Sequence, residues 1–188
     1  MKNLINTVII SIAMMLPLKM AGQSIINTKH NLSASGPGTI KATSETEVCI
    51  FCHTPHNAKH TRPLWNRNDP AATYTTYTST TTNASIGQPD GASILCLSCH
   101  DGTIALGSVV SKSTMISFGG LTTLPSGRSN LGTNLTDDHP ISFLYNAALA
   151  STNGQLKQPT SITPPVYLDK DGKMQCTSCH DAHENTYD

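Results

Sequence analysis

The amino-acid sequence predicts a mostly irregular fold, made of coil with short α-helices and a few short strands. Hydrophobic residues make up 37% of the 188 residues and aromatic residues 5%, which is below the usual apolar share of a soluble domain. The 13 glycines and 11 prolines favour turns over long regular elements. All six cysteines lie in three copies of one pattern, CxxCH. A chain so poor in large side chains needs another source of buried apolar surface. The three CxxCH copies indicate what that source is.

The three CxxCH motifs are Cys49–His53, Cys96–His100 and Cys176–His180. This pattern is the attachment site of a c-type haem, in which both thiols form thioethers to one porphyrin and the histidine lies under the iron. The sequence therefore predicts three covalent haems c. Their apolar faces would form the core of a multihaem cytochrome c. The predicted ligands are Cys49, Cys52, Cys96, Cys99, Cys176 and Cys179, with His53, His100 and His180 as proximal iron ligands.

Two other uses of the cysteines are weaker. A zinc site needs CxxC pairs that meet two by two, so three pairs leave one over unless histidines complete separate sites. Six cysteines in an exported chain could also form three disulfides. Neither alternative explains why a histidine follows every CxxC pair.

Residues 1–22 are typical of a secretory signal peptide. Lys2 supplies a positive end, Leu4 to Leu18 form an apolar run, and Met20 to Gly22 place small residues near a cleavage point. The run is shorter than a bilayer-spanning helix needs, although an uncleaved anchor is the alternative. We therefore expect an exported protein, periplasmic or extracellular at the cell surface, with no stable membrane span. Its mature part, residues 23–188, would be one triheme cytochrome c domain.

The charge balance limits the class of partner. The formal net charge is zero, and without the leader ten basic residues face twelve acidic ones. This balance argues against nucleic acid as a partner. Redox partner proteins or extracellular electron acceptors fit better.

Several elements are expected between the motifs. Residues 44–47 resemble a capped helix start and predict a short helix that carries the first motif. Residues 73–82 are rich in Thr and Tyr and favour an extended segment, residues 103–106 a short helical or extended one, and residues 119–132 a loop. We expect a polar turn at 136–140, one short helix at 142–150, a linker at 153–165, and a tight hairpin at 167–175.

The other histidines decide the iron ligation. Five remain besides the proximal ones, so all three irons can be ligated by two histidines: His30, His56, His60, His139 and His183. Methionine is the main alternative ligand, but only Met115 and Met174 follow the leader. Imidazole on both faces predicts low-potential, six-coordinate, low-spin haems.

The first and third motifs share a longer form, CxxCHxxH, which ends at His56 and His183. On a continuing helical turn, a histidine three residues on lies near the same face as the proximal one. It cannot reach the far side of its own iron, so we expect it to ligate the iron of a neighbouring haem. His60 has no such context and is not predicted to be a ligand.

The motifs and the segments around them resemble the multihaem c-type cytochromes of the doubled-CxxCH family, common in metal-reducing and other anaerobic bacteria. The matching stretches are 30–33, 36–41, 48–57, 64–67, 96–107, 137–140 and 176–183. The resemblance implies an electron carrier in which His30 and His139 are distal ligands. The expected allotment is His30, His56 and His139 for the three irons, with His183 as a bridging or spare ligand. Relatives often continue into a further CxxCH, so a C-terminal truncation is left open.

Three functional hypotheses follow. The first is an exported electron-transfer protein that is not an enzyme. The second is a multihaem reductase, which would need an open iron position. The third is a subunit of a polymeric extracellular cytochrome filament, in which His183 or His30 ligates the haem of a neighbouring subunit.

Overall fold

The computed structural model describes residues 24–59 and 64–185. The predicted leader and His60 lie outside these ranges. Within them, regular structure is limited to two short helices, one pair of two-residue strands and three single 3-10 turns. These elements are α2 (Gly91–His100), α3 (Ala147–Asn153), β1 (Phe143–Leu144) and β2 (Lys173–Met174), with 3-10 turns at Ile25–Asn27, Pro159–Ser161 and Cys176–Ser178. The predicted irregular architecture is confirmed.

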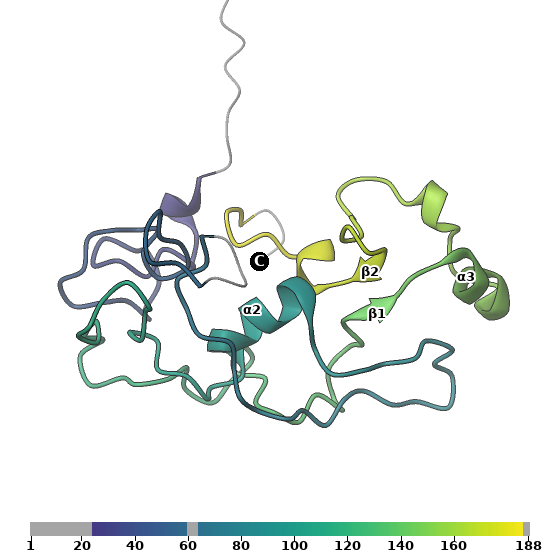
Figure 1. The fold of residues 1–188 in the computed structure, drawn as a ribbon, viewed down its shortest axis with the longest axis horizontal. Helices are drawn as coiled ribbons and strands as arrows, with labels where there is room; N and C mark the ends of the chain where they lie inside the picture. Colours follow the sequence, from purple (N-terminus) through teal and green to yellow (C-terminus); the bar gives the residue numbers. More distant parts are fainter. Residues whose placement is uncertain (1–23, 60–63, 186–188) are drawn as a thin grey trace, which may run out of the picture.

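Helix α2 lies near the middle of the molecule, with β1, β2 and α3 to one side of it (Figure 1). It begins after Asp90, whose backbone is extended, and it ends at His100. Gly102 follows with φ at 68°, the left-handed conformation that commonly ends a helix. The second CxxCH motif therefore lies in the last turns of a helix. The sequence interpretation missed this helix, although Asp90 and Gly102 are the signals that bound it.

Two small hydrophobic clusters flank α2. The first contains Phe51, Leu106 and Phe118 among its buried members, and Cys52 and Cys99 pack against it. The second contains Tyr74, Ile94, Leu97, Leu135 and Ile141, and Cys176 packs against it. Cysteines of the CxxCH motifs therefore pack against both clusters.

The only regular strand pairing within the described ranges joins β1 to β2. The strands are antiparallel, with Phe143 opposite Met174 and Leu144 opposite Lys173. A turn forms within the expected hairpin, at Asp169–Gly172, because the Gly172 amide donates to the Asp169 carbonyl at 3.0 Å. The predicted hairpin over 167–175 is wrong, however, since β2 pairs with the distant strand β1.

The helix expected at 142–150 is half wrong. Residues 143–144 form β1, and α3 begins only after Asn146, whose side-chain oxygen accepts a hydrogen bond from the Leu149 amide at 2.9 Å. Asn146 is a strong N-cap residue, so it sets the start of the helix later than expected. The predicted linker accordingly follows α3 and holds the 3-10 turn at Pro159–Ser161.

The helix predicted to carry the first motif is absent, and residues 48–52 form turns. The chain leaves after one turn because Thr54 donates its amide to the Leu64 carbonyl at 2.9 Å. Pro55 follows, and it disfavours a helical conformation for the residue before it. The segment 103–106 is also neither helix nor strand, whereas 119–132 is a loop and 136–137 a turn as predicted. The Thr/Tyr segment is coil with one bridge, from Thr75 to Asn134.

Helices in the described ranges are all too short, or too polar, to cross a membrane.

Candidate cofactor-binding site

Each CxxCH motif forms one helical turn, although the surrounding structure differs. In the first and third motifs the histidine amide donates to the carbonyl of the first cysteine, at 2.7 Å for His53 and 3.0 Å for His180. The second motif achieves the same turn within α2. Residues three and four positions apart lie on one face of such a turn. Both thiols and the histidine of each motif therefore belong to one side of the backbone.

The structure brings the three motifs together along α2. Cys52 of the first motif and Cys99 of the second both pack on the cluster around Phe51. Cys96, one turn earlier on α2, shares a side-chain hydrogen bond with Cys176 of the third motif. Helix α2 thus lies between the first and third motifs.

The protein environment shifts the pKa of four thiols around α2, upward for three of them and downward for Cys176. Burial raises the pKa of Cys52 to about 12, with Cys99 adding to the effect and Arg67 opposing it. Burial likewise raises the pKa of Cys99. The hydrogen bond with Cys176 raises the pKa of Cys96, and the same bond lowers that of Cys176. These titrations belong to the chain before any thioether forms.

Each proximal histidine faces one histidine from another part of the chain. The ring centroids are 6.4 Å apart for His53 and His183, 6.4 Å for His180 and His139, and 6.0 Å for His100 and His30. The ring planes differ by 11° in the first pair, 14° in the second and 52° in the third. The chain thus forms three pairs, and no proximal histidine is left unmatched.

This separation fits two imidazoles on opposite faces of one metal. A metal–imidazole bond of about 2.0 Å, plus about 1.1 Å from the nitrogen to the ring centre, places trans rings about 6 Å apart. Ordinary aromatic contacts also fall within about 4.5–7 Å, so the distance alone does not decide. Four of the six rings belong to residues that are exposed overall: His53, His139, His180 and His183. Each motif histidine faces one other histidine, and this one-to-one matching favours a group that both histidines of a pair would bind.

The hydrogen bonds of three of these rings leave Nε2 available. His100 Nδ1 lies 2.7 Å from the Ser129 carbonyl, and His183 Nδ1 lies 3.1 Å from Asp181 Oδ1. His139 Nδ1 lies 3.4 Å from the Pro140 carbonyl. An acceptor at Nδ1 selects the tautomer whose Nε2 lone pair can bind a metal.

The neutral form is also favoured at His53. Burial lowers its pKa, and the neighbouring His183 imidazole lowers it further. Only the neutral imidazole has a lone pair for a metal.

The pairing differs from the expected allotment. His183 faces His53, whereas His56 is exposed and faces no imidazole within the described ranges. The physical reason is tertiary: the third motif is tied to α2, and this attachment carries its C-terminal extension toward the first motif. His183 therefore reaches from the third motif to the first, as a histidine at that spacing was expected to reach a neighbour.

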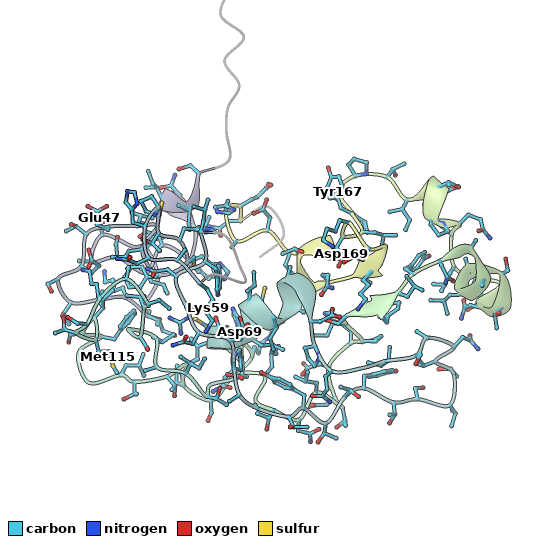
Figure 2. All side chains as sticks on the ribbon, viewed as in Figure 1. Glu47, Lys59, Asp69, Met115, Tyr167 and Asp169 are labelled. Atoms are coloured by element: carbon cyan, nitrogen blue, oxygen red, sulfur yellow. The ribbon has the colours of Figure 1, made fainter. Side chains whose placement is uncertain are left out.

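Neither methionine of the described ranges lies beside a motif histidine as an axial ligand would. Met115 is 62% exposed at the outer edge of the molecule (Figure 2). Met174 lies in β2 opposite Phe143.

Buried polar side chains hold the motifs in place, and the sequence interpretation missed them. Asn66 donates to the Ile50 carbonyl at 2.6 Å and receives the Ser111 amide at 2.8 Å. Gln175 accepts from the Ser93 hydroxyl of α2 at 2.6 Å. Arg67 donates to the Ser98 carbonyl of the second motif at 2.9 Å. Nothing in the local pattern distinguishes such residues from surface ones before their burial is known.

The two aspartates that follow proximal histidines have different roles. Asp101 is buried and accepts from the Tyr74 hydroxyl at 2.6 Å. Burial raises the pKa of Tyr74, and the Asp101 carboxylate adds to the effect, so Tyr74 stays a donor. Asp181 instead accepts from His183, two residues on.

The rival uses of the cysteines gain no support from the described residues. All six cysteines are free thiols. Within residues 24–59 and 64–185, no three or more Cys, His, Asp or Glu side chains converge as they would around a bare metal ion. The histidines instead form pairs with ring centroids 6.0–6.4 Å apart, an arrangement that suits a group bound by two imidazoles.

A buried donor beside the first motif also fits such a group. The Trp65 indole Nε1 is buried and has no hydrogen-bond partner among residues 24–59 and 64–185, and its ring meets the His53 ring edge to face at 5.7 Å. Buried N–H groups normally have an acceptor. The carboxylates of a haem are acceptors of the required kind.

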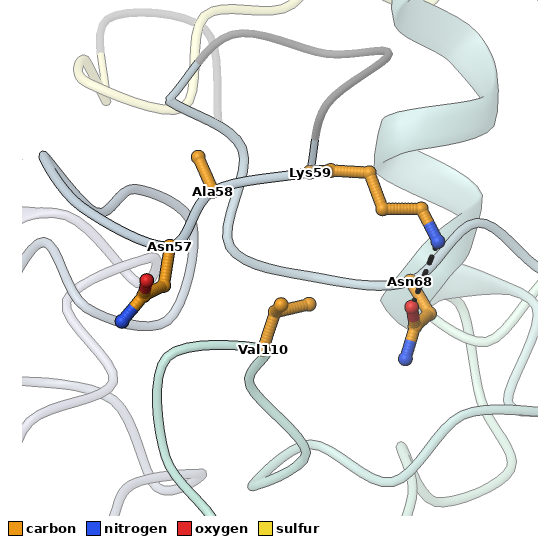
Figure 3. A pocket seen from close by; sticks show the side chains of 5 residues that line it. All are labelled: Asn57, Ala58, Lys59, Asn68 and Val110. Atoms are coloured by element: carbon orange, nitrogen blue, oxygen red, sulfur yellow. Dashed lines mark hydrogen bonds between the residues drawn. The ribbon is translucent and has the colours of Figure 1, made fainter.

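A surface hollow opens beyond the first motif and is lined by Asn57, Ala58, Lys59, Asn68 and Val110 (Figure 3). The Lys59 ammonium donates to the Asn68 side-chain oxygen across it, at 2.9 Å. None of the motif cysteines or paired histidines lines this hollow, so we assign it no part in cofactor binding.

No family model and no curated protein matches this chain. The functional assignment therefore depends on the three motifs and the three histidine pairs.

Proposed function

We propose that this chain is an electron-transfer protein with three covalent c-type haems, each with two axial histidines. The observation that carries the proposal is the matching of His53, His100 and His180 with three different histidines at 6.0–6.4 Å. A haem, when bound, supplies reversible one-electron chemistry at its iron. The doubled-CxxCH resemblance supports the same proposal.

The residues of this chain would attach, ligate and space the cofactors. Each cysteine pair would fix one porphyrin edge, and the histidine pairs would be His53 with His183, His100 with His30, and His180 with His139. The shared packing of Cys52 and Cys99 on one hydrophobic cluster, and the hydrogen bond between Cys96 and Cys176, would keep neighbouring attachment edges close. Short separations between redox centres are what an electron carrier needs.

The pairing favours transfer over catalysis. A multihaem reductase needs an iron with an open position for its substrate. Here every proximal histidine already has a facing imidazole, so we propose no enzymatic activity. The exported location, with redox proteins or extracellular acceptors as partners, belongs to the same proposal.

Assembly into a filament stays a second candidate, but on a different residue. His30 and His183 face proximal histidines of the same chain, so neither is available to a neighbour in this arrangement. His56 is the exposed histidine of a CxxCHxxH segment. Self-assembly through haem ligation would therefore depend on His56.

The direct test is haem stoichiometry on protein produced with cytochrome c maturation. A pyridine haemochrome assay and an intact mass should both give three covalent haems per chain. Replacing both cysteines of one motif by alanine should remove one haem and leave the other two. A colourless protein whose thiols are free or paired would overturn the proposal.

A further inference from the structure

The guanidinium of Arg67 is fully buried, with 0% of the residue exposed. Its Nε donates to Ser98 Oγ at 3.2 Å. Each terminal nitrogen donates twice, Nη1 to the carbonyls of Leu106 and Ser108 and Nη2 to those of Ser98 and Ala105. An arginine side chain has five N–H donors, and all five are used here on neutral acceptors.

Within the described residues no carboxylate accepts a hydrogen bond from Arg67, although the buried Asp101 carboxylate opposes its effect at Cys99. The ion pairs found in residues 24–59 and 64–185 do not include Arg67. Because its donors are already occupied, Arg67 has none left for a haem carboxylate either. Buried arginines normally pair with an acid, since an isolated buried charge is unfavourable. Neutral side chains could also bridge these carbonyls, so the burial of a positive charge here indicates a role for the charge itself.

Arg67 contacts the second motif directly and the first through its neighbour in sequence, and none of its described hydrogen bonds reaches the third motif. It contacts Ser98, inside the second motif, directly. The Asn66 amide, next to Arg67 in sequence, donates to the Cys52 carbonyl of the first motif at 2.9 Å. The field of Arg67 lowers the pKa of both Cys52 and Cys99, against the larger effect of burial.

We propose that Arg67 is an internal positive charge that raises the reduction potentials of the first and second haems relative to the third. This inference rests on the proposed function. When ferric iron takes one electron, the positive charge at the iron falls by one, so a nearby fixed cation favours the ferrous form. The electron comes from the redox partner and no proton is required. Arg67 thereby sets the order in which the three irons are reduced.

The test is a spectroelectrochemical titration of the holoprotein carrying Arg67→Gln, with Arg67→Lys as the charge-retaining partner. In Arg67→Gln, two of the three one-electron waves should move to lower potential. The expected change is about tenfold in the ratio of ferric to ferrous iron at a fixed potential, which is about 59 mV for a one-electron couple. In Arg67→Lys, which keeps the positive charge, the potentials of these two waves should stay close to those of the wild-type protein. Lys170→Gln, which removes an exposed cation, should leave all three waves in place.

A second variant keeps the test decisive if Arg67→Gln fails to fold. Ser98→Asp places a carboxylate against the retained guanidinium, and it should lower the same two waves. The shift should persist at high salt, because a buried charge is screened less than a surface one. Unmoved waves in variants that keep three low-spin haems would overturn the role of Arg67 while the proposed function stands. Equal shifts in Arg67→Gln and Arg67→Lys would also overturn it, since they would show a purely structural role. Wild-type protein without haem would instead overturn the proposed function.

Discussion

The two CxxCHxxH segments, Cys49–His56 and Cys176–His183, share one spacing but differ in what their last histidine faces. His183 lies opposite His53, whereas His56 is exposed and faces no imidazole within the described ranges. Both begin with the same helical turn, so local geometry does not cause the difference. The spacing places the last histidine on the same side of the turn as the motif histidine, and tertiary structure then decides which other motif it meets.

The attachment of each segment to the rest of the molecule explains this outcome. The third motif is tied to α2 through Gln175, which contacts Ser93. The segment beyond it runs back to the N-terminal region, where the Thr28 hydroxyl donates to the Ala182 carbonyl at 3.1 Å. This contact lies next to His183. After the first motif, Pro55 and the hydrogen bond from the Thr54 amide to the Leu64 carbonyl end the helical turn before His56.

Replacing the last histidine of each segment by alanine should give the largest difference between the two segments, in spin state and cyanide binding. His183→Ala should open one of the three irons, because His53 loses the imidazole that faces it. Electronic spectra and cyanide binding should then report one high-spin, ligand-accessible haem. The matched variant His56→Ala should keep the wild-type spectrum. A high-spin haem in His56→Ala, with none in His183→Ala, would reverse the assignment of the two segments.

Disrupting the attachment of the third motif should reduce stability. Gln175 is 2% exposed and also donates to the carboxylates of Asp90 and Asp169, at 3.0 and 2.9 Å. Gln175→Leu leaves several buried groups without partners, so the free energy of unfolding should fall by about 3 kcal/mol. Urea denaturation followed by circular dichroism measures this fall. Gln155→Leu, at an exposed position, should change it by less than about 0.5 kcal/mol. Equal effects of the two variants would show that Gln175 does not secure the third motif.

A smaller effect is expected from the acceptor that orients His183. Asp181→Ala removes the carboxylate that lies 3.1 Å from His183 Nδ1 and should weaken His183 as a ligand. Cyanide should then compete about tenfold better at the first haem, a typical consequence of losing such a partner. Cyanide titration followed in the Soret band measures it. Asp171→Ala, at an exposed turn, is the control, and identical cyanide affinities in the two variants would exclude the orienting role.

The smallest effect concerns acid stability at the start of α2. Burial raises the pKa of Asp90, but hydrogen bonds from Lys173 and Gln175 outweigh it, so the pKa lies below its ordinary value. The stabilisation is present above the unfolded pKa of about 3.9 and is lost as the pH falls through the lower folded value. Asp90→Asn should flatten the pH dependence of unfolding in this window. Because the Asp90 side chain is 44% exposed, the change should stay below about 1 kcal/mol. An unchanged pH profile would count against the contribution of Asp90.

The sequence predicted the irregular fold and the positions of the motifs, because CxxCH and the scarcity of large apolar residues are local properties. Turn residues also indicated a turn near Asp171 and Gly172, and the structure has one at Asp169–Gly172. Long-range pairing was beyond such signals. No residue near His183 predicts that its ring faces His53, and no residue near β2 predicts that the strand pairs with β1. Arg67 and Gln175 were missed for the same reason, since burial turns an ordinary polar residue into an anchor.

The measurement that tests the central claim most directly is low-temperature EPR of the oxidised protein, quantified against its haem content. The three histidine pairs predict three haems per chain and low-spin ferric signals from all of them. The pair His30 and His100, whose ring planes are tilted by 52°, should give a signal distinct from those of the two nearly parallel pairs. A high-spin signal equivalent to one haem or more in the wild-type protein would contradict the account.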